Sequence, residues 1–302
     1  MKKNTPSKDK PANKPANTPA NKPANRPLKK STRPVKRSAE DNPFKAQRAV
    51  YKPFIAKTHE DESDMRLNKF VALCGIASRR AAADLIKEGT VYVNGVVMTE
   101  IGYRVLPKDV VTYKGNVLSL VSKKIYILLN KPKDTITTLK DEKGRKTVMD
   151  IVRRTVRERV YPVGRLDRDT TGLLLLTNDG ELAQKLAHPS YRIKKLYHVV
   201  LNKALTKDDL RQISEGLKLE DGIAEVDVVN YVEGAGKDEV MVEIHIGKNR
   251  IVRRIFEHLG YDVVKLDRVY YGGLTKKDLP RSGYRSLTDR EIIMLKHFTG
   301  KS

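Results

Sequence analysis

Regular spacing of apolar residues begins near residue 65 and marks a first group of elements. Four apolar residues within the stretch 65–74 lie three or four positions apart, which predicts an amphipathic helix that ends at a glycine. A second helix is expected from Ser78, whose side chain can cap it, to Gly89. Asn94 and Gly95 then separate two short valine-rich stretches, a strong signal for a β-hairpin. Two helices followed by short strands predict a small module over residues 65–122.

A second group of elements occupies residues 124–299. A continuous apolar run at residues 125–129 predicts a buried strand, and alternating runs at 226–232 and 240–246 predict two paired strands. Thr206 and Thr288 are expected to cap helices. Expected strands come next to one another as often as they alternate with helices. We therefore predict an α+β protein, in which the larger domain has a mixed, mostly antiparallel sheet flanked by helices.

Residues 1–60 lack such periodicity and repeat the unit Pro-Ala-Asn before they turn basic. Ordering the first 57 of them would cost roughly 60 to 110 kcal/mol of conformational free energy. Their few large apolar side chains, if fully buried, would return about 10 to 20 kcal/mol. We expect residues 1–60 to form a disordered basic arm unless a partner orders it.

The excess of Lys and Arg makes this protein a candidate for binding a polyanion. The formal net charge is +23, and residues 1–57 hold 16 Lys and Arg against three Asp and Glu, so both the arm and the remainder are basic. A basic surface without a partner is the alternative, and charge alone does not decide between them. Cys74 is the only cysteine, and no run approaches 18 apolar residues. These features favour a cytoplasmic, soluble protein that has no internal disulfide and does not bind membranes. We also expect it to be a monomer.

The two expected helices of the first module carry cations at positions that do not favour helix stability. Arg79 and Arg80 lie in a first helical turn, where positive charge opposes the helix dipole. With Lys69 and Lys87 they are expected to form a face that contacts RNA phosphates, and an ordinary solvated face is the alternative. The motifs Arg-Leu-Asn-Lys, Ser-Arg-Arg-Ala and Val-Tyr-Val-Asn-Gly resemble the S4 RNA-binding module over roughly residues 65–110.

Two charged stretches of the larger domain are candidates for its chemistry. The turn 161–172 holds Asp167 between two apolar strands, where an isolated aspartate more often makes only local hydrogen bonds. The stretch 247–256 starts a helix with four cations, which suits an RNA backbone or a carboxylate better than helix stability. Lys248 and Arg250 of this stretch are therefore expected to bind the substrate.

Several ordered motifs make the resemblance to one family specific. Residues 65 to about 298 resemble a bacterial ribosomal-RNA pseudouridine synthase of the RsuA/RluB group, which joins an S4 module to a catalytic domain. The matching stretches are 129–132 (Leu-Asn-Lys-Pro), 164–167 (Gly-Arg-Leu-Asp), 171–175, 177–180 (Thr-Asn-Asp-Gly), 195–197, 247–250, 252–254 and 285–288.

The resemblance implies a function for five residues. Asp167 would be the nucleophile, Tyr197 the tyrosine that stacks on the base and handles a proton, and Arg253 the cation paired with the aspartate. Arg165 would fill the gap left by the extracted nucleotide, and Val252 would pack on the uracil opposite the tyrosine. The reaction involves no redox step, and neither a metal nor an organic cofactor is expected.

The expected function is the isomerisation of uridine to pseudouridine in ribosomal RNA, free or within a pre-ribosomal particle. The long match at residues 177–180 and the basic arm favour 23S rRNA of the large subunit. A synthase for 16S rRNA of the small subunit and a non-catalytic rRNA-binding assembly factor are the alternatives. Two positions depart from the group, because Ile251 stands where glutamine is usual and Asp134 where glycine is common.

Overall fold

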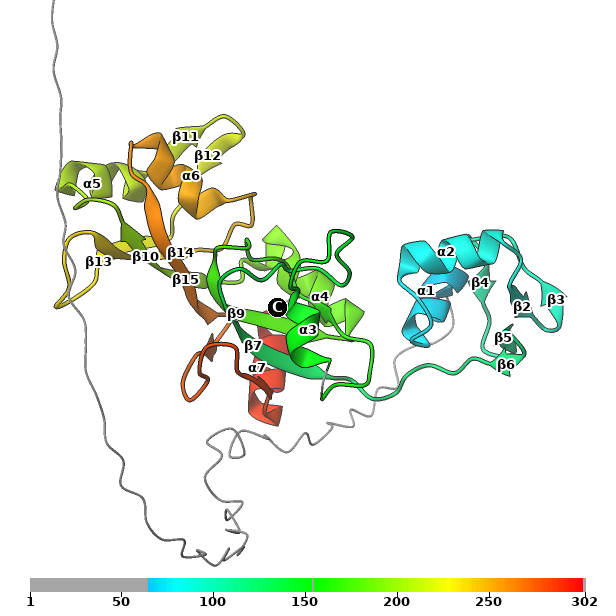
Figure 1. Cartoon of the computed structure of the whole chain (residues 1–302). Coiled ribbons are helices and arrows are strands. Elements are labelled where there is room, and N and C mark those ends of the chain that lie inside the picture. Colours follow the sequence, from blue (N-terminus) through cyan, green and yellow to red (C-terminus); the bar gives the residue numbers. More distant parts are fainter. Residues whose placement is uncertain (1–64, 154, 301–302) are drawn as a thin grey trace, which may run out of the picture. The chain divides into compact units, whose positions relative to one another are not determined.

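The computed structural model describes residues 65–153 and 155–300 (Figure 1). The predicted basic arm, residues 1–60, lies outside the described residues. Within those residues, none of the helices has the length and apolar character needed to cross a membrane.

The first module has the predicted two helices followed by short strands. Its elements are β1 (Met65–Arg66), α1 (Leu67–Leu73), α2 (Arg79–Lys87), β2 (Val91–Val93), β3 (Val96–Val97), β4 (Arg104–Val105), β5 (Val111–Tyr113) and β6 (Asn116–Val117). The Ser78 hydroxyl accepts a hydrogen bond from the Ala81 amide at 3.1 Å, which confirms the predicted cap of α2. Asn94 and Gly95 both have positive φ, as a tight hairpin turn requires, and join β2 to β3.

The larger domain is built on one nine-stranded sheet, with the main strand order β13-β14-β10-β15-β9-β7-β17. Its strands are β7 (Tyr126–Lys131), β8 (Tyr161–Pro162), β9 (Thr171–Thr177), β10 (Lys195–Leu201), β13 (Val228–Tyr231), β14 (Glu239–Ile244), β15 (Val263–Tyr271), β16 (Leu274–Thr275) and β17 (Tyr284–Ser286). The pair β15–β9 is parallel and the other pairs are antiparallel. The predicted mixed, mostly antiparallel sheet is confirmed.

Helices cover both faces of this sheet. They are α3 (Val148–Val152), α4 (Gly180–Ala187), a short 3₁₀ helix (Pro189–Tyr191), α5 (Lys207–Glu215), α6 (Ile251–His258) and α7 (Asp289–Phe298). Alternate residues of β7 point to opposite faces: Leu129 packs in one apolar core with α3, α5 and α6, and Leu128 in another with α4 and α7. Burial on both faces explains why this strand is a continuous apolar run instead of an alternating one.

The helix caps predicted at Thr206 and Thr288 are confirmed, because each side chain accepts a hydrogen bond from an amide in the first turn of α5 or α7. The start of α6 differs from the expectation. The helix begins only at Ile251, and Arg250 precedes it with φ 47°. Two of the four predicted cations therefore lie in the connection from β14, where their side chains are not constrained by helical geometry. A separate hairpin that the pattern did not predict is formed by β11 (Leu217–Leu219) and β12 (Gly222–Ala224).

Candidate active site

The turn that carries Asp167 connects β8 to β9 and is held by a buried lysine of β7. The Lys131 side chain is fully buried, and its Nζ donates to the carbonyl oxygens of Arg168 at 3.2 Å and Thr170 at 2.7 Å. Burial lowers the Lys131 pKa to about 8, against a partial opposing effect of nearby carboxylates. The Thr137 hydroxyl also donates to the Leu166 carbonyl at 2.8 Å. The backbone on both sides of Asp167 is thereby fixed to the sheet.

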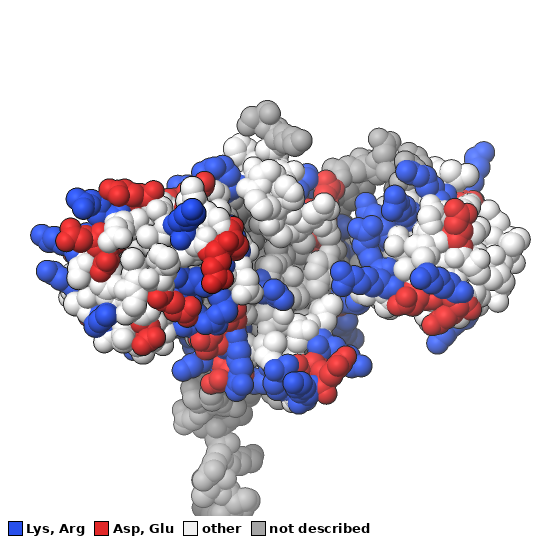
Figure 2. Space-filling view, turned by 90° about the horizontal axis from the view of Figure 1, so that it is seen from above, with Lys and Arg blue, Asp and Glu red and all other residues white. Residues whose placement is uncertain are grey.

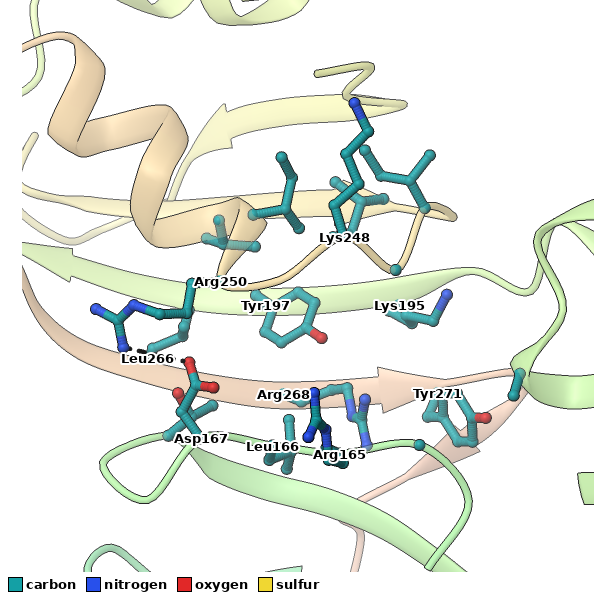
Figure 3. Close-up of a pocket in the computed structure, with 18 of the residues that line it drawn as sticks. Arg165, Leu166, Asp167, Lys195, Tyr197, Lys248, Arg250, Leu266, Arg268 and Tyr271 are labelled. Carbon is teal, nitrogen blue, oxygen red and sulfur yellow. Dashed lines mark ion pairs between the residues drawn. The ribbon is translucent and has the colours of Figure 1, made fainter. Parts of the chain in front are cut away.

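A cavity of about 180 Å³ opens beside this turn. It is lined by the turn, by β10 and β15, and by the connection from β14 into α6. Figure 3 shows Asp167 next to Arg250, Tyr197 and Lys195 along β10, and Arg268 with Tyr271 on β15. Segments far apart in the sequence thus contribute to one site.

Asp167 makes its ion pair with Arg250 instead of with the predicted arginine. The distance from Arg250 Nη1 to Asp167 Oδ2 is 3.6 Å, and both side chains remain about one third to two fifths exposed. The left-handed backbone of Arg250 immediately before α6 accompanies a side chain that turns toward the Asp167 loop (Figure 3). The carboxylate is oriented and still accessible from the cavity.

The predicted pairing of Arg253 with Asp167 is corrected by the structure. Arg253 is buried, and its Nη2 lies 2.8 Å from Asp169 Oδ2 while its Nη1 donates to the Val263 carbonyl at 2.8 Å. It lies in the first turn of α6, and its side chain reaches between the helix and the start of β15. Arg253 therefore ties the helix to the second carboxylate of the turn.

Tyr197 and Val252 lie in the cavity, as their predicted functions require. Tyr197 projects from β10 and is 8% exposed, and Val252 in the first turn of α6 is 3% exposed. Leu166 and Leu266 add further apolar lining. A flat aromatic ring between aliphatic side chains is suited to the faces of a planar base.

Arg165 and Lys248 also line the cavity, but their surroundings differ. Arg165 is exposed, which leaves its guanidinium accessible to a ligand. Lys248 instead contacts the β11–β12 hairpin, where its Nζ donates to the carbonyls of Asp221 at 2.9 Å and Ile223 at 3.2 Å. Arg254 holds the Asp221 carboxylate with two hydrogen bonds of 3.0 and 2.6 Å and lowers its pKa to about 2. Two of the four predicted cations, Lys248 and Arg254, are thus bound to the tip of the β11–β12 hairpin.

The sequence reasoning missed two cations of the cavity, Lys195 and Arg268. Arg268 is 3% exposed and lies two positions after Leu266, so both side chains occupy the buried face of β15. Lys195 precedes Tyr197 by two positions in β10 and lies on the same face of the strand. Lys195 and Arg268 could have been identified from the sequence, because each is a single cation on the apolar face of a strand with alternating polarity.

Comparisons with known proteins identify the family. The model of the RNA pseudouridylate synthase family matches residues 125–258, and the model of the S4 domain matches residues 65–111. A ribosomal large subunit pseudouridine synthase B of Bacillus subtilis is 42% identical over 234 residues, covering 76% of this chain and 95% of the relative. The chain belongs to the RNA pseudouridylate synthase family.

Two further matches also cover about three quarters of this chain. A ribosomal large subunit pseudouridine synthase B of Vibrio cholerae is 38% identical over 238 residues, which is 76% of this chain and 74% of the relative. A crystal structure of a pseudouridylate synthase aligns with a TM-score of 0.55 and 27% identity, covering 76% of this chain and 99% of that one. The expected fold, an S4 module followed by a synthase domain, is confirmed.

The four predicted RNA-binding cations of the first module lie within the part of the chain that matches the S4 domain. Lys69 on α1 and Arg79, Arg80 and Lys87 on α2 are all exposed. None of the four makes an ion pair with another described residue. Figure 2 shows Lys and Arg gathered mainly on one flank of this module. Exposed cations without partners in the described part of the chain are available to phosphates.

The departure from the group at Asp134 has a visible structural reason. Asp134 has φ 59°, a left-handed conformation that glycine adopts without strain and that aspartate tolerates better than most residues. Its carboxylate lies 3.3 Å from Arg168 Nε, in an exposed pair. The side chain therefore contacts the turn that carries Asp167 without lining the cavity. For Ile251, which is buried in the first turn of α6, the structure offers no further explanation.

Within residues 65–153 and 155–300, no group of three or more His, Cys, Asp or Glu side chains is arranged to hold a metal ion. The titratable groups of the cavity are a carboxylate, two phenols and several cations. Such a set can supply a nucleophile, a proton relay and electrostatic stabilisation of negative charge.

Proposed function

We propose that this protein isomerises a specific uridine of large-subunit ribosomal RNA to pseudouridine, with Asp167 as the nucleophile. The observation that carries the proposal is the accessible Asp167 carboxylate at the same cavity as the buried Tyr197 ring, in a chain of this family. The names of the relatives from Bacillus subtilis and Vibrio cholerae support large-subunit rRNA as the substrate.

The reaction detaches uracil from the ribose and reattaches it through carbon. The glycosidic bond from N1 to C1′ breaks, a bond from C5 to C1′ forms, the proton on C5 leaves, and N1 gains a proton. An Asp167 oxygen would attack either C1′ or C6 while Tyr197 and Val252 hold the two faces of the ring. The Tyr197 hydroxyl would relay the proton.

The base must leave its stack to reach a cavity of this size. Extrusion costs a few kcal/mol and costs least in a loop or a strained helix. Arg165, exposed beside the cavity, would occupy the vacated place in the RNA. The S4 module would offset the cost with further phosphate contacts. We also propose that the protein acts on rRNA or a pre-ribosomal particle in the cytoplasm and as a monomer.

The test replaces Asp167 by asparagine, which keeps the shape of the side chain and removes its charge. We expect Asp167→Asn to abolish pseudouridine formation and to bind the same RNA nearly as well as the unchanged protein. Asp134→Asn is the matched control, because this exposed carboxylate lies outside the cavity and asparagine tolerates its positive φ.

The measurement is pseudouridine mapping in rRNA from cells that lack the chromosomal copy and express each variant. Modification by Asp167→Asn at the level of the control would contradict the nucleophile. A missing pseudouridine in 16S instead of 23S rRNA would favour the small-subunit alternative. Unchanged pseudouridines in cells without the protein would favour a non-catalytic assembly factor.

A further inference from the structure

The cavity lining contains a buried guanidinium with a free donor. Arg268 is 3% exposed, and its Nε donates to the Leu173 carbonyl at 2.7 Å. The face of its guanidinium lies over the Tyr271 ring at 4.7 Å. Its Nη2 atom is buried and has no hydrogen-bond partner among the described residues. The structural contacts of Arg268 therefore leave one donor of a buried cation unused.

A second cation lies close to Arg268. Lys195 is partly buried, and its Nζ donates to the His245 carbonyl at 2.6 Å. Burial and, to a smaller extent, the positive charge of Arg268 lower the Lys195 pKa to about 8. Neither cation has an ion-pair partner among residues 65–153 and 155–300. A buried cation next to a partly buried one is costly unless a ligand brings negative charge.

The register of the sheet places these cations beside the proposed base site. Tyr197 of β10 is directly opposite Arg268 of β15, and Lys195 is opposite Tyr271. All four side chains line the same cavity, and Asp167 lies at a different part of its wall (Figure 3). A pyrimidine ring stacked on Tyr197, with its sugar toward Asp167, would therefore direct a ring edge toward Arg268 and Lys195.

The proposed reaction builds negative charge on the oxygens of that ring. When the bond from C1′ to N1 breaks, its electron pair stays on the uracil and spreads over N1, O2 and O4. When a carboxylate instead adds to C6, the electrons of the double bond from C5 to C6 move onto O4. The ring electron pair later forms the bond from C5 to C1′, the C5 proton leaves, and N1 takes up a proton. Both routes thus require stabilisation of a charged carbonyl oxygen.

We propose that Arg268 and Lys195 form an oxyanion site that binds the uracil carbonyl oxygens and stabilises their negative charge during detachment. The inference rests on the proposed function and adds two catalytic residues to it. Preorganised donors aimed at developing charge in a closed site act more strongly than the same groups in water. The Arg268 Nη2 atom, which has no partner among the described residues, would donate a hydrogen bond to the substrate oxygen.

The first part of the test separates catalysis from RNA binding. Arg268→Gln removes the charge and keeps an amide N–H for the Leu173 carbonyl, and Lys195→Gln does the same for the His245 carbonyl. We expect each to lower the single-turnover rate roughly 100-fold, as loss of one oxyanion donor does, with little change in RNA affinity. Arg285→Gln is the matched control, because this partly buried arginine pairs with Glu291 outside the cavity.

The second part identifies the group that the cations contact. The substrate is an rRNA fragment whose target uridine is replaced by 2-thiouridine or 4-thiouridine, in which sulfur accepts hydrogen bonds weakly. We expect the rate loss of the Arg268 and Lys195 variants to shrink on at least one thio substrate. A methylphosphonate next to the target, which removes a phosphate charge, should leave the full loss.

The outcomes distinguish this inference from the function on which it rests. An unchanged protein that modifies no rRNA would contradict the proposed function itself. An active protein whose Arg268 and Lys195 variants react at the unchanged rate would contradict only the oxyanion site. A loss that disappears with the methylphosphonate, or that is found wholly in affinity, would assign the cations to a backbone phosphate. Thermal unfolding checks each variant, and Arg268→Lys replaces Arg268→Gln should the latter fail to fold.

Discussion

Gly172 permits the close parallel approach of β9 and β15 on which the cavity depends. A Cβ atom added there would lie 2.3 Å from the Arg268 carbonyl oxygen and 2.5 Å from its amide nitrogen, both backbone atoms that cannot rotate away. Gly172 also has φ 106°. For Gly172→Ala, we expect about 1 to 2 kcal/mol of backbone strain and about 1 to 3 kcal/mol of overpacking. The free energy of unfolding should therefore fall by roughly 2 to 5 kcal/mol.

Gly144→Ala separates the two contributions. Gly144 has φ 66° and no atom within 4 Å of an added Cβ, so this variant carries only the backbone strain. Urea unfolding followed by circular dichroism gives the two free energies, and hydrogen exchange of the β9 and β15 amides shows where structure is lost. Equal losses in both variants would refute the argument that contact between β9 and β15 demands glycine at residue 172.

Two further predictions concern RNA binding. Asp221→Asn should release Arg254, whose two hydrogen bonds go to the Asp221 carboxylate, whereas the backbone carbonyls that hold Lys248 remain. RNA binding should tighten several-fold, and its salt dependence should steepen by roughly one phosphate contact, or about 0.7 to 0.9 in the logarithmic slope. An affinity equal to that of the control Asp278→Asn, which makes the same charge change, would exclude competition by the hairpin. Replacing Arg79 and Arg80 together by glutamine should lower that slope by about 1.5 and weaken binding without loss of stability, since both cations oppose the α2 dipole. An unchanged slope in filter-binding titrations at several salt concentrations would assign these arginines to a solvated face.

Much of the fold followed from local signals in the sequence. Caps such as Ser78 and Thr288 and the Asn-Gly turn at 94–95 act on their own neighbours, so their outcome depends little on the rest of the chain. The mixed sheet followed from the order of strands and helices. The pattern did not predict the β11–β12 hairpin, because its strands have only three residues each and leave no clear periodicity.

The arginine partners depended on tertiary geometry that no motif specifies. Arg250 and Arg253 lie three positions apart, and a resemblance alone cannot say which reaches Asp167 and which reaches Asp169. The answer follows from the position at which α6 begins, since Arg250 precedes the helix and Arg253 lies within it. The predicted function of Arg253 remains open to test, although its pairing was wrong.

The cavity contains both a carboxylate and cations, which bears on where electron density would move during the proposed reaction. The Asp167 carboxylate, the buried Arg268 and the partly buried Lys195 line the same cavity as the Tyr197 ring (Figure 3). In the proposed mechanism, attack by the carboxylate would drive electron density through the uracil toward its carbonyl oxygens, and therefore toward the two cations. The same approach of β9 to β15 that requires Gly172 brings these groups together. A loss of activity in Gly172→Ala that exceeds its loss of folded protein would thus report on the distance between nucleophile and cations.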